Sequence, residues 1–417
     1  MAEKKNKLFY GWIVVAAGAM VTGAGVGILL NCNGLFIKPV TDSLGFTRGA
    51  FTLYTTFQSL VTMVLAPFYG EIFKRFSIRK VMLAAATYCS IVYFMFSFAT
   101  QLWHFYVLGT LYGLAASGTT IMAVGTLVNR WFLEKKGTAA GLAFSGSGLT
   151  AAIMMKVTSS VIENNGWQWG FRVQAVAAYA LFFIACVFLI RDNPEDMGLV
   201  PLGAEKLTNA GGAPVRLGLT RTAALKTSTF YIMAAGFFLN SMIGMGINPH
   251  IKACLTDIGY SDSFAATVAS VVMMVMIFAK VLLGAAFDKI GPKATGFLVG
   301  FVLLASSLLI MSSGKSEMLP WVFAVFFGFG YSTLSVPYSY LTGAIFGDRE
   351  FSGIYSVCTM LSTAGGAVGP VLSGFIFDVT GSYSLVFAVY AVASAAVIVL
   401  LMTAAKQGQS RGYALAE

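Results

Sequence analysis

The sequence contains few charged residues and only two histidines, and no two of its cysteines have the spacing of a metal-binding or redox motif. Only 11% of its 417 residues are charged, whereas a soluble protein carries about 25%. The five cysteines all lie within apolar runs and show no CxxC spacing, which argues against a disulfide framework and a zinc site. No nucleophile–base pair or phosphate loop is evident within the apolar runs. We therefore expect no metal, no cofactor and no enzymatic activity.

Apolar residues are abundant instead. Hydrophobic side chains make up 57% of the chain, and the mean hydropathy is +0.79. The net charge of +10 does not indicate nucleic acid, because the basic residues lie in short loops between apolar runs and form no continuous patch. A chain of this composition needs a lipid bilayer as its solvent.

Twelve long apolar runs are separated by charged or turn-rich segments. A helix needs about 20 residues to cross a bilayer, and each run is long enough. We therefore predict an all-α membrane protein with twelve transmembrane helices. The expected spans are 9–37, 48–73, 79–100, 103–129, 138–163, 168–190, 227–255, 263–287, 293–313, 318–346, 351–377 and 382–405.

Lysine and arginine are distributed unevenly between the two sides of these spans. Of the 27 basic residues, 20 fall on the side that carries both termini and five on the other side. The remaining two, Lys156 and Lys280, fall within spans. Because short cytoplasmic loops carry the excess of basic residues, we expect both termini in the cytoplasm.

The stretch 191–226 is the only long polar break, and it is rich in Gly, Pro and charged residues. It reads as a linker between two halves. We expect a six-helix bundle at 1–190, a cytoplasmic linker at 191–226 and a second six-helix bundle at 227–417. Two six-helix units related by pseudo-symmetry are typical of transporters, in which the site lies near the midplane between the halves.

The two halves share loop sequences at a constant offset of 214 residues. GEIFKRFSIRK (70–80) follows the second span, and GAAFDKIGPKA (284–294) follows the eighth. WFLEKKG (131–137) and IFGDREF (345–351) have the same offset. These matches support duplication of a six-helix unit.

The loop after the eighth span resembles the signature of the major facilitator superfamily. The residues that fit are Gly284, Asp288, Lys289, Gly291 and Lys293. In the first half Gly70 and Arg75 match, but Lys74 stands where the aspartate is expected and Ser77 replaces a glycine. The resemblance implies the major facilitator fold with a gate at these loops, to which we also assign Glu134. The departure at Lys74 leaves the first-half brace of that gate in question.

Further stretches resemble the monocarboxylate transporter family: YGW (10–12), WFLEKKGTAAGLAFSGSG (131–148) and NPEDMGLVP in the linker. The resemblance covers the whole chain. It implies proton-coupled symport of small monocarboxylates such as L-lactate or pyruvate, by alternating access, in the cytoplasmic membrane of a bacterium. The alternative is an organic-anion exchanger on the same fold, like the related oxalate–formate exchangers. The expected partners are the monocarboxylate, a proton and the bilayer, and the protein is expected to be a monomer.

Lys280 is a cation within an apolar helix. It lies eight residues before Asp288, which is about 12 Å along a helix and therefore close to the midplane of the bilayer. An ionisable group at this depth costs roughly 3 kcal/mol or more and usually faces a cavity or a partner. The middles of the spans contain essentially no Asp or Glu that would make a structural pair. We therefore expect Lys280 to bind the substrate anion, although relatives most often carry arginine at this place.

One central cation neutralises one negative charge, and this favours a monocarboxylate. In oxalate-exchanging relatives a second lysine of the eleventh span helps hold a dianion, and Cys358 stands near that place here. Lys156 lies near the outer end of its span, from which it can reach the interface.

Proton coupling requires a further titratable group. The family often carries an aspartate one turn before the basic residue, but Met276 stands there. We expect Asp257 to carry the proton, with Lys280 as the rival; Asp257 could equally be a solvated loop carboxylate that caps the next helix. The further substrate-binding candidates are polar residues in apolar runs, each of which could instead be satisfied within the bundle: Asn31, Tyr331, Thr119, Ser335 and Tyr54.

Overall fold

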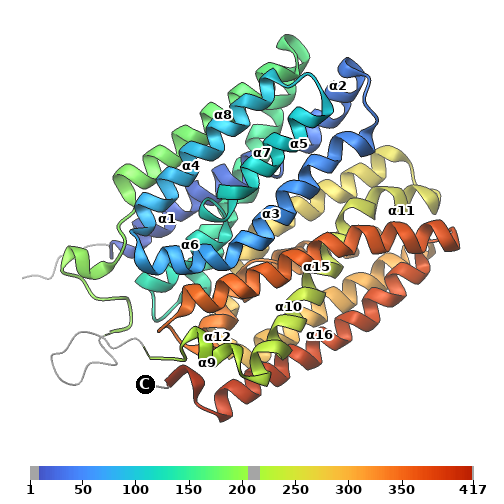
Figure 1. Cartoon of the computed structure of the whole chain (residues 1–417). Helices are drawn as coiled ribbons and strands as arrows, with labels where there is room; N and C mark the ends of the chain where they lie inside the picture. The colour runs from blue at the N-terminus through green and yellow to red at the C-terminus, as the bar shows by residue number, and fades with distance from the viewer. Residues whose placement is uncertain (1–8, 205–216, 416–417) are drawn as a thin grey trace, which may run out of the picture.

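Helices dominate the computed structural model, which describes residues 9–204 and 217–415. The described chain contains no β-strand beyond two isolated bridges, so the prediction of an all-α protein is confirmed. We call α1–α8 the N-terminal half and α9–α16 the C-terminal half (Figure 1). The helices of the N-terminal half are α1 (Gly11–Thr22), α2 (Gly34–Leu44), α3 (Arg48–Arg75), α4 (Ile78–Met95), α5 (Leu102–Ala115), α6 (Ile121–Trp131), α7 (Lys136–Asn165) and α8 (Trp167–Ile184).

The C-terminal half repeats this arrangement. Its helices are α9 (Arg221–Leu225), α10 (Ser228–Ile247), α11 (Ile251–Asp257), α12 (Asp262–Met311), α13 (Leu319–Ser332), α14 (Val336–Phe346), α15 (Phe351–Thr380) and α16 (Ser384–Ser410). The predicted linker contains the short helix α9 and a 3-10 turn, Pro194–Met197. Its residues 205–216 lie outside the described part of the chain.

The described helices account for the twelve predicted crossings. Ten helical stretches are long and apolar enough to span a membrane, and the pair α13–α14, bent by 45°, adds an eleventh. Helix α12 covers the expected eighth and ninth spans, because Gly291 interrupts it with φ 76° and ψ 173°. Glycine tolerates this left-handed conformation without the steric cost that a side chain adds. The chain therefore turns back between two crossings at Gly291.

Two spans are broken at corresponding places in the two halves. Between α5 and α6 the chain leaves α-helical geometry at 116–120, and between α13 and α14 it does so at 333–335. Shifted by the offset of 214 residues seen in the loops, the first break falls at 330–334 and overlaps the second. Interrupted helices at matching positions of a repeat are a feature of transporter sites. The first span also contains a π-helical segment, Gly23–Ile28, and such segments are frequent at functional sites.

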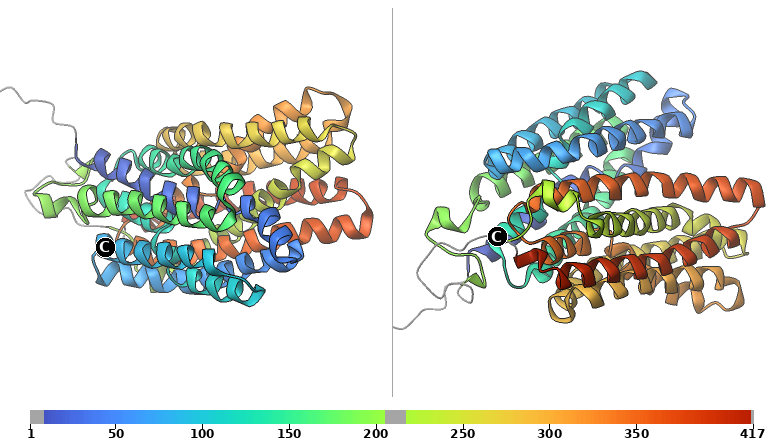
Figure 2. Two further views of the ribbon diagram at one scale, coloured as in Figure 1. Left: turned by 90° about the horizontal axis from the view of Figure 1, so that it is seen from above. Right: turned by 60° about the horizontal axis from the view of Figure 1, so that its bottom comes forward.

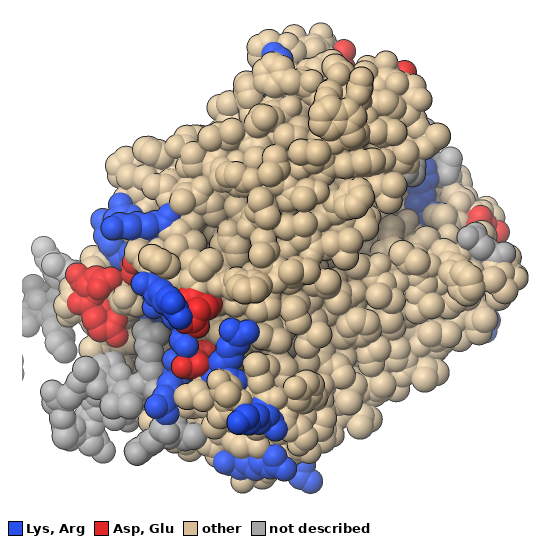
Figure 3. Space-filling model, viewed as in Figure 1, with Lys and Arg blue, Asp and Glu red and all other residues tan. Residues whose placement is uncertain are grey.

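The surface separates a broad apolar band from a charged end. Large apolar side chains such as Phe278, Val371 and Val392 are well exposed. Acidic and basic residues gather mainly at the end of the bundle where the described chain begins and ends, which we call the terminal side (Figure 3). An uncharged belt of this kind suits lipid, in which exposed apolar side chains cost nothing. The chain is thus a multi-pass membrane protein.

Two helix pairs join the halves. Helix α7 packs along α12, and α3 packs along α15 (Figure 2). Glycines permit the first contact: a Cβ at Gly141 would overlap the carbonyl oxygen of Lys280, and one at Gly284 would overlap that of Gly137. Small residues allow helices in lipid to approach this closely. The small-residue stretch of the fifth span is therefore the surface on which the two halves meet.

Candidate functional site

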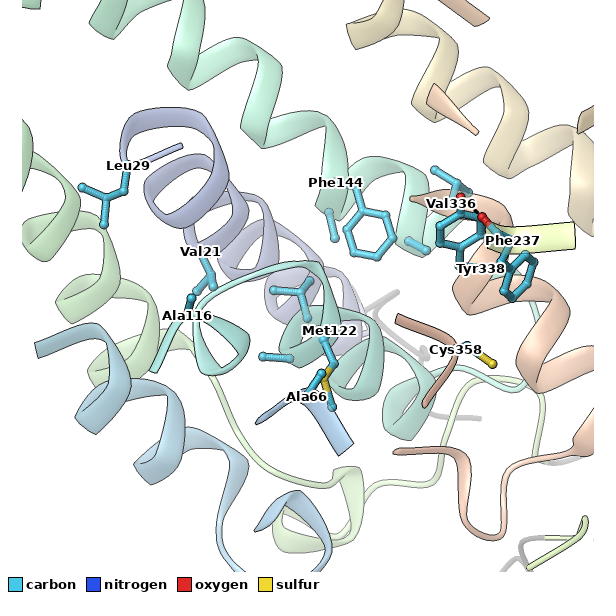
Figure 4. Packing of buried hydrophobic residues seen from close by; sticks show 14 of the residues in the cluster. Val21, Leu29, Ala66, Ala116, Met122, Phe144, Phe237, Val336, Tyr338 and Cys358 are labelled. Atoms are coloured by element: carbon cyan, nitrogen blue, oxygen red, sulfur yellow. Dashed lines mark hydrogen bonds between the residues drawn. The ribbon is translucent and has the colours of Figure 1, made fainter. Parts of the chain in front are cut away.

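A cavity of about 420 Å³ lies between the two halves, and both contribute to its lining. Its residues come from the first span, α3, the break between α5 and α6, the start of α6, α10, the break between α13 and α14, the start of α14, and α15. In Figure 4, Met122 and Ala66, which both line the cavity, lie next to each other. The lining residues are Val26, Leu30, Asn31, Gln58, Ser59, Thr62, Ala66, Ala116, Ser117, Thr120, Ile121, Met122, Ser241, Met245, Leu334, Tyr338, Tyr355, Thr359, Ser362, Thr363, Gly366 and Ala367.

No charged side chain is among these described lining residues, and the polar ones are hydroxyls and amides. Many of them follow helical spacing along two facing helices. On α3, Gln58 and Thr62 are one turn apart, and on α15, Tyr355, Thr359 and Thr363 are each one turn apart. Residues three or four apart share a face of a helix. The cavity is thus flanked by two polar stripes, one from each half.

One tyrosine of the lining is held firmly by the bundle. The hydroxyl group of Tyr338 receives a hydrogen bond from Asn240 Nδ2 at 2.9 Å and lies 2.8 Å from Ser241 Oγ. Its ring lies against Phe237, with centroids 4.3 Å apart, and both are visible in Figure 4. Because the partners of this phenol are buried side chains of α10, Tyr338 is a fixed part of the cavity wall.

Lys280 lies on α12 at the contact with α7 and is 5% exposed. Its ammonium donates to Ser147 Oγ at 2.8 Å and to the carbonyl oxygen of Phe144 at 3.3 Å. No carboxylate of the described chain forms an ion pair with it. An ammonium group has three N–H donors, so neutral oxygens satisfy two of them and the charge is unmatched. Lys280 is not among the residues that line the cavity.

Charged contacts close the space between the halves on the terminal side. Lys136 at the start of α7 contacts both carboxylate oxygens of Asp348 at 2.6 Å. Asn129 of α6 donates to the same carboxylate at 3.0 Å. Exposed surface pairs contribute at most about 1 kcal/mol, whereas separating the partners of a partly buried pair leaves an uncompensated charge and costs more. The Lys136–Asp348 pair therefore holds the loops of the two halves together.

The loop aspartate of the second half caps a helix of the first half. Asp288 of α12 accepts hydrogen bonds from the backbone amides of Gly137 and Thr138 at 2.7 and 2.8 Å, and from the Thr138 hydroxyl at 2.6 Å. These amides are at the N-terminus of α7, where a negative charge is favourable. Asp288 is thus a brace between the halves, as the resemblance implied.

Lys74 is the residue of the first half that corresponds to Asp288. It carries the opposite charge but also forms a contact between the halves. Lys74 of α3 lies 2.9 Å from Glu350, the residue before α15. Partial burial raises the pKa of Glu350, but hydrogen bonds from Lys74 and from the Arg221 backbone amide outweigh it and hold the pKa below its ordinary value. The brace that was in question is therefore present, with lysine and glutamate in place of aspartate and backbone amides.

The two ends of the linker are paired with the two gate loops. Leu202 donates to the carbonyl oxygen of Trp131 at 3.0 Å and accepts from the amides of Leu133 and Glu134. In the other half, Leu219 donates to the carbonyl oxygen of Phe346 at 2.9 Å, and the carbonyl oxygen of Leu217 accepts from Asp348 at 2.8 Å. The linker therefore holds the loops that carry Lys136 and Asp348 in a pseudo-symmetric manner.

These contacts define which side of the cavity is closed. The Lys136–Asp348 and Lys74–Glu350 pairs and the Asp288 cap are formed by residues at the terminal-side ends of the helices, whereas the cavity lining begins further along α3 and α15. Toward the opposite side the halves separate, and Figure 3 shows a hollow between them there. A cavity between two pseudo-symmetric halves that is closed on one side is the geometry of alternating access.

Comparisons with known proteins agree with this architecture. The family model of the Major Facilitator Superfamily matches residues 13–238 and 233–412. The chain belongs to the major facilitator superfamily. Because this is a superfamily of transporters, the protein is a transporter and not an enzyme, and the predicted fold is confirmed.

Relatives with similar sequences are monocarboxylate transporters. The chain is 25% identical over 388 residues to monocarboxylate transporter 13 of Rattus norvegicus, with 91% of this chain and 85% of the relative covered. It is 26% identical over 394 residues to monocarboxylate transporter 11 of Homo sapiens, with 91% and 79% covered. The predicted similarity to monocarboxylate transporters is confirmed, and the family that is shown for the chain is the major facilitator superfamily.

Solved transporters share the fold. The superfamily transporter FucP in the outward conformation has a TM-score of 0.69 at 12% identity, and the alignment covers 95% of this chain and 99% of FucP. The proton:xylose symporter XylE has a TM-score of 0.74 at 10% identity, with 95% of each chain covered. At these identities the likeness concerns the fold.

Of the residues of this transporter that the sequence nominated for substrate binding, only Asn31 lines the cavity. Thr119 is fully buried, and its hydroxyl donates to the carbonyl oxygen of Ala116. Its neighbours Ser117 and Thr120 line the cavity instead. Thr119 itself is turned away from the cavity, because the chain is not α-helical at this break and side-chain direction there does not follow helical spacing. Its role in substrate binding stays a prediction.

Four other nominated residues lie outside the lining. Tyr54 is buried in an aromatic cluster of the N-terminal half, with Phe51 at 5.2 Å between ring centroids. Ser335 is buried and donates to the carbonyl oxygen of Ser332, the last residue of α13. Cys358 is fully buried. Tyr331 contacts the sulfur of Met245, which does line the cavity.

The remaining nominated residues lie at the ends of helices. Asp257 is exposed at the end of α11, on the open side of the molecule. Lys289 and Lys293 are exposed, and Arg75 pairs with Glu71 of its own helix at 2.9 Å, so it makes no contact across the gate. Gly70 of α3 packs against α15, where Ser352 Oγ donates to its carbonyl oxygen at 3.1 Å and a Cβ would overlap the Ser352 carbonyl oxygen. In the motif it is therefore Asp288, Gly284, Gly70 and the lysine at position 74 that join the halves.

Sequence reasoning missed the polar stripes of the cavity. Gln58 and Thr62 of α3, and Tyr355, Thr359 and Thr363 of α15, recur every four residues within otherwise apolar spans. Polar side chains at helical spacing in a lipid-embedded helix face the bundle interior. This periodicity indicates both stripes, although Tyr54, one turn before Gln58, has the same spacing and lies outside the lining.

Proposed function

We propose that this transporter carries small monocarboxylates such as L-lactate or pyruvate together with protons. Alternating access through two six-helix bundles, 1–190 and 227–417 joined by the linker 191–226, moves the substrate across the cytoplasmic membrane of a bacterium. Both termini are cytoplasmic in this proposal, so the terminal side is the inner side, and the monomer is the working unit. The unmatched positive charge of Lys280 at the contact of the two halves is the observation that supports this function best.

Energetics support an anionic substrate. A charged group in the middle of a membrane protein costs several kcal/mol unless a partner compensates it. Ser147 and Phe144 supply dipoles but no negative charge to Lys280. A monocarboxylate supplies one negative charge, which makes the loaded site neutral. In the proposal the long lysine side chain exchanges its contacts on α7 for the substrate carboxylate.

The uncharged lining of the cavity favours a small polar acid over a dianion. Every anionic group beyond the first would be buried against hydroxyls and amides without a counter-charge, which is costly. The names of the relatives, monocarboxylate transporters 13 and 11, support the same substrate class. A volume of about 420 Å³ is sufficient for an acid of a few carbon atoms with accompanying water.

Proton coupling is assigned to Asp257, with Lys280 as the rival carrier. Asp257 lies on the open side, at the end of α11, which packs against α12. Closure of that side would move the two halves together around the Asp257 carboxylate. We propose that it is protonated during transport and approaches Lys280 in the empty, outward-closed state. Uptake by Asp257→Asn as a function of pH tests the assignment, and unchanged coupling rejects it.

Obligatory exchange of organic anions is the second candidate. No described carboxylate accompanies Lys280, so an anion would be needed there in each direction of a strict exchanger. Proton influx with external lactate, measured in vesicles that contain no internal substrate, separates the two mechanisms. Influx supports symport, whereas a strict requirement for an internal acid supports exchange.

The decisive experiment compares lysine variants in proteoliposomes with labelled L-lactate. Lys280→Gln should abolish uptake, and Lys280→Arg should retain it, because arginine keeps the charge and adds a bidentate geometry for carboxylates. Lys156→Gln is the matched control, since Lys156 is exposed in the neighbouring helix α7. Full activity of the Lys280→Gln protein would contradict the proposed role.

A further inference from the structure

Tyr355 of α15 is a cavity residue whose phenolic oxygen has no partner in the described chain. The residue is fully buried, and its Oη accepts and donates no hydrogen bond to the described residues. It nevertheless belongs to the cavity lining. Burying a hydroxyl group without a hydrogen-bond partner typically destabilises a protein by about 1–3 kcal/mol. Such a group at the wall of a binding cavity indicates that a bound molecule completes it.

The ring of Tyr355 is fixed in place from both halves. It stacks on Phe351 of its own helix, with centroids 5.1 Å apart and planes 27° apart. On the other side it lies against Gly125 of α6, where a Cβ would approach its Cε1 to 2.9 Å and its Oη to 3.2 Å. Because the glycine leaves space for the ring and no more, the oxygen is held at one position. The donor is thus preorganised.

Other hydroxyls continue from Tyr355 along the same wall. Thr359 and Thr363 follow at one and two turns on α15, and Gln58 and Thr62 face them from α3. This wall is distinct from the contact of α7 with α12 that holds Lys280, because no residue of α7 or α12 belongs to the cavity lining. In the proposed function, Lys280 supplies the cationic part of the site, and this wall supplies the neutral, hydrogen-bonding part.

We propose that Tyr355 is a specificity-determining residue that donates a hydrogen bond to a second oxygen of the substrate. The transporter then prefers hydroxy- and oxo-carboxylates to unsubstituted carboxylates of the same length. This inference rests on the proposed function, in which Lys280 binds the carboxylate. Sites that are built to hydrogen-bond a substrate oxygen discriminate strongly against the analogue that lacks it, because the protein group is then left unpaired.

The test uses competition in proteoliposomes. Uptake of labelled L-lactate is measured against unlabelled L-lactate and against unlabelled propionate, which lacks the hydroxyl, for the wild-type protein, Tyr355→Phe and Tyr112→Phe. Tyr112 is the matched control, because its hydroxyl group is also buried and without a described partner but does not line the cavity. Elution as a monodisperse peak in detergent checks the fold of each variant.

We expect the preference for lactate over propionate to fall about tenfold or more in Tyr355→Phe, through weaker lactate binding with unchanged propionate binding. Tyr112→Phe should keep the wild-type ratio. Thr359→Val should lower the ratio in the same direction, because Thr359 belongs to the same wall. An unchanged ratio in Tyr355→Phe overturns this inference and leaves the proposed function standing. A wild-type protein that takes up neither acid overturns both.

Discussion

The backbone contact between α7 and α12 can be tested by adding one methyl group. Gly284 and Gly137 lie so close that a Cβ at Gly284 would overlap the carbonyl oxygen of Gly137 and would reach 3.2 Å from the Cα of Gly141. Neither obstacle is the flexible end of a side chain, so the helices themselves must move apart. We therefore expect Gly284→Ala to destabilise the conformation that is closed on the terminal side.

The magnitude follows from the cost of overpacking, which is about 1–3 kcal/mol for an added methyl group in a close-packed contact. The cost applies to the closed arrangement only, because the helices separate here when the terminal side opens. The ratio of terminal-open to terminal-closed molecules should rise about 5- to 150-fold. If the terminal-open state is a minor one in the wild type, its accessibility rises by the same factor.

The assay measures modification of an Asn31→Cys probe by a membrane-impermeant maleimide that is added from the terminal side. Asn31 lines the cavity and is exposed, whereas the five native cysteines are buried. Gly374→Ala in α15 is the matched control, since a Cβ there meets no atom within 4 Å. Equal modification rates in the Gly284→Ala and Gly374→Ala proteins would refute the reasoning.

Three further predictions concern charges. Lys74→Glu and Glu350→Lys should each reduce transport. The double variant, in which both charges are reversed, should regain most of what either single change loses. A double variant that is no better than the single variants would contradict a direct pairing. Because the pKa of Glu350 is depressed in the closed gate, its contribution is complete above the ordinary value of 4.5 and is lost as the pH falls through the depressed value. The thiolate that reacts with a maleimide itself becomes scarcer on acidification, so the readout is the ratio of the terminal-side modification rate in the wild-type gate to that in Glu350→Gln at the same pH. This ratio should rise on acidification toward one. Asp348→Asn should leave the half-buried ammonium group of Lys136 without its partner. The cavity probe should then be modified faster from the terminal side than in Glu350→Gln, because the Lys136–Asp348 pair is more buried than the Lys74–Glu350 pair. Comparison of the two modification rates tests this.

The sequence determined the architecture of this transporter. Apolar runs of bilayer length, a polar linker and loop sequences repeated at a fixed offset were sufficient for twelve crossings in two related halves. These features are readable because a lipid environment requires continuous apolar helices, and this constraint acts on local sequence. The same constraint made Lys280 conspicuous, since a charge in the middle of such a helix needs a reason.

The tertiary structure decided which residues face the cavity. Thr119, Ser335 and Cys358 are polar groups in apolar spans, as Asn31 is, but only Asn31 lines the cavity. Side-chain direction depends on helix rotation and on the breaks at 116–120 and 333–335, and neither follows from composition. The pairing of Lys74 with Glu350 could not be predicted from the sequence either. The two residues are more than 270 positions apart and meet only when the two halves pack together.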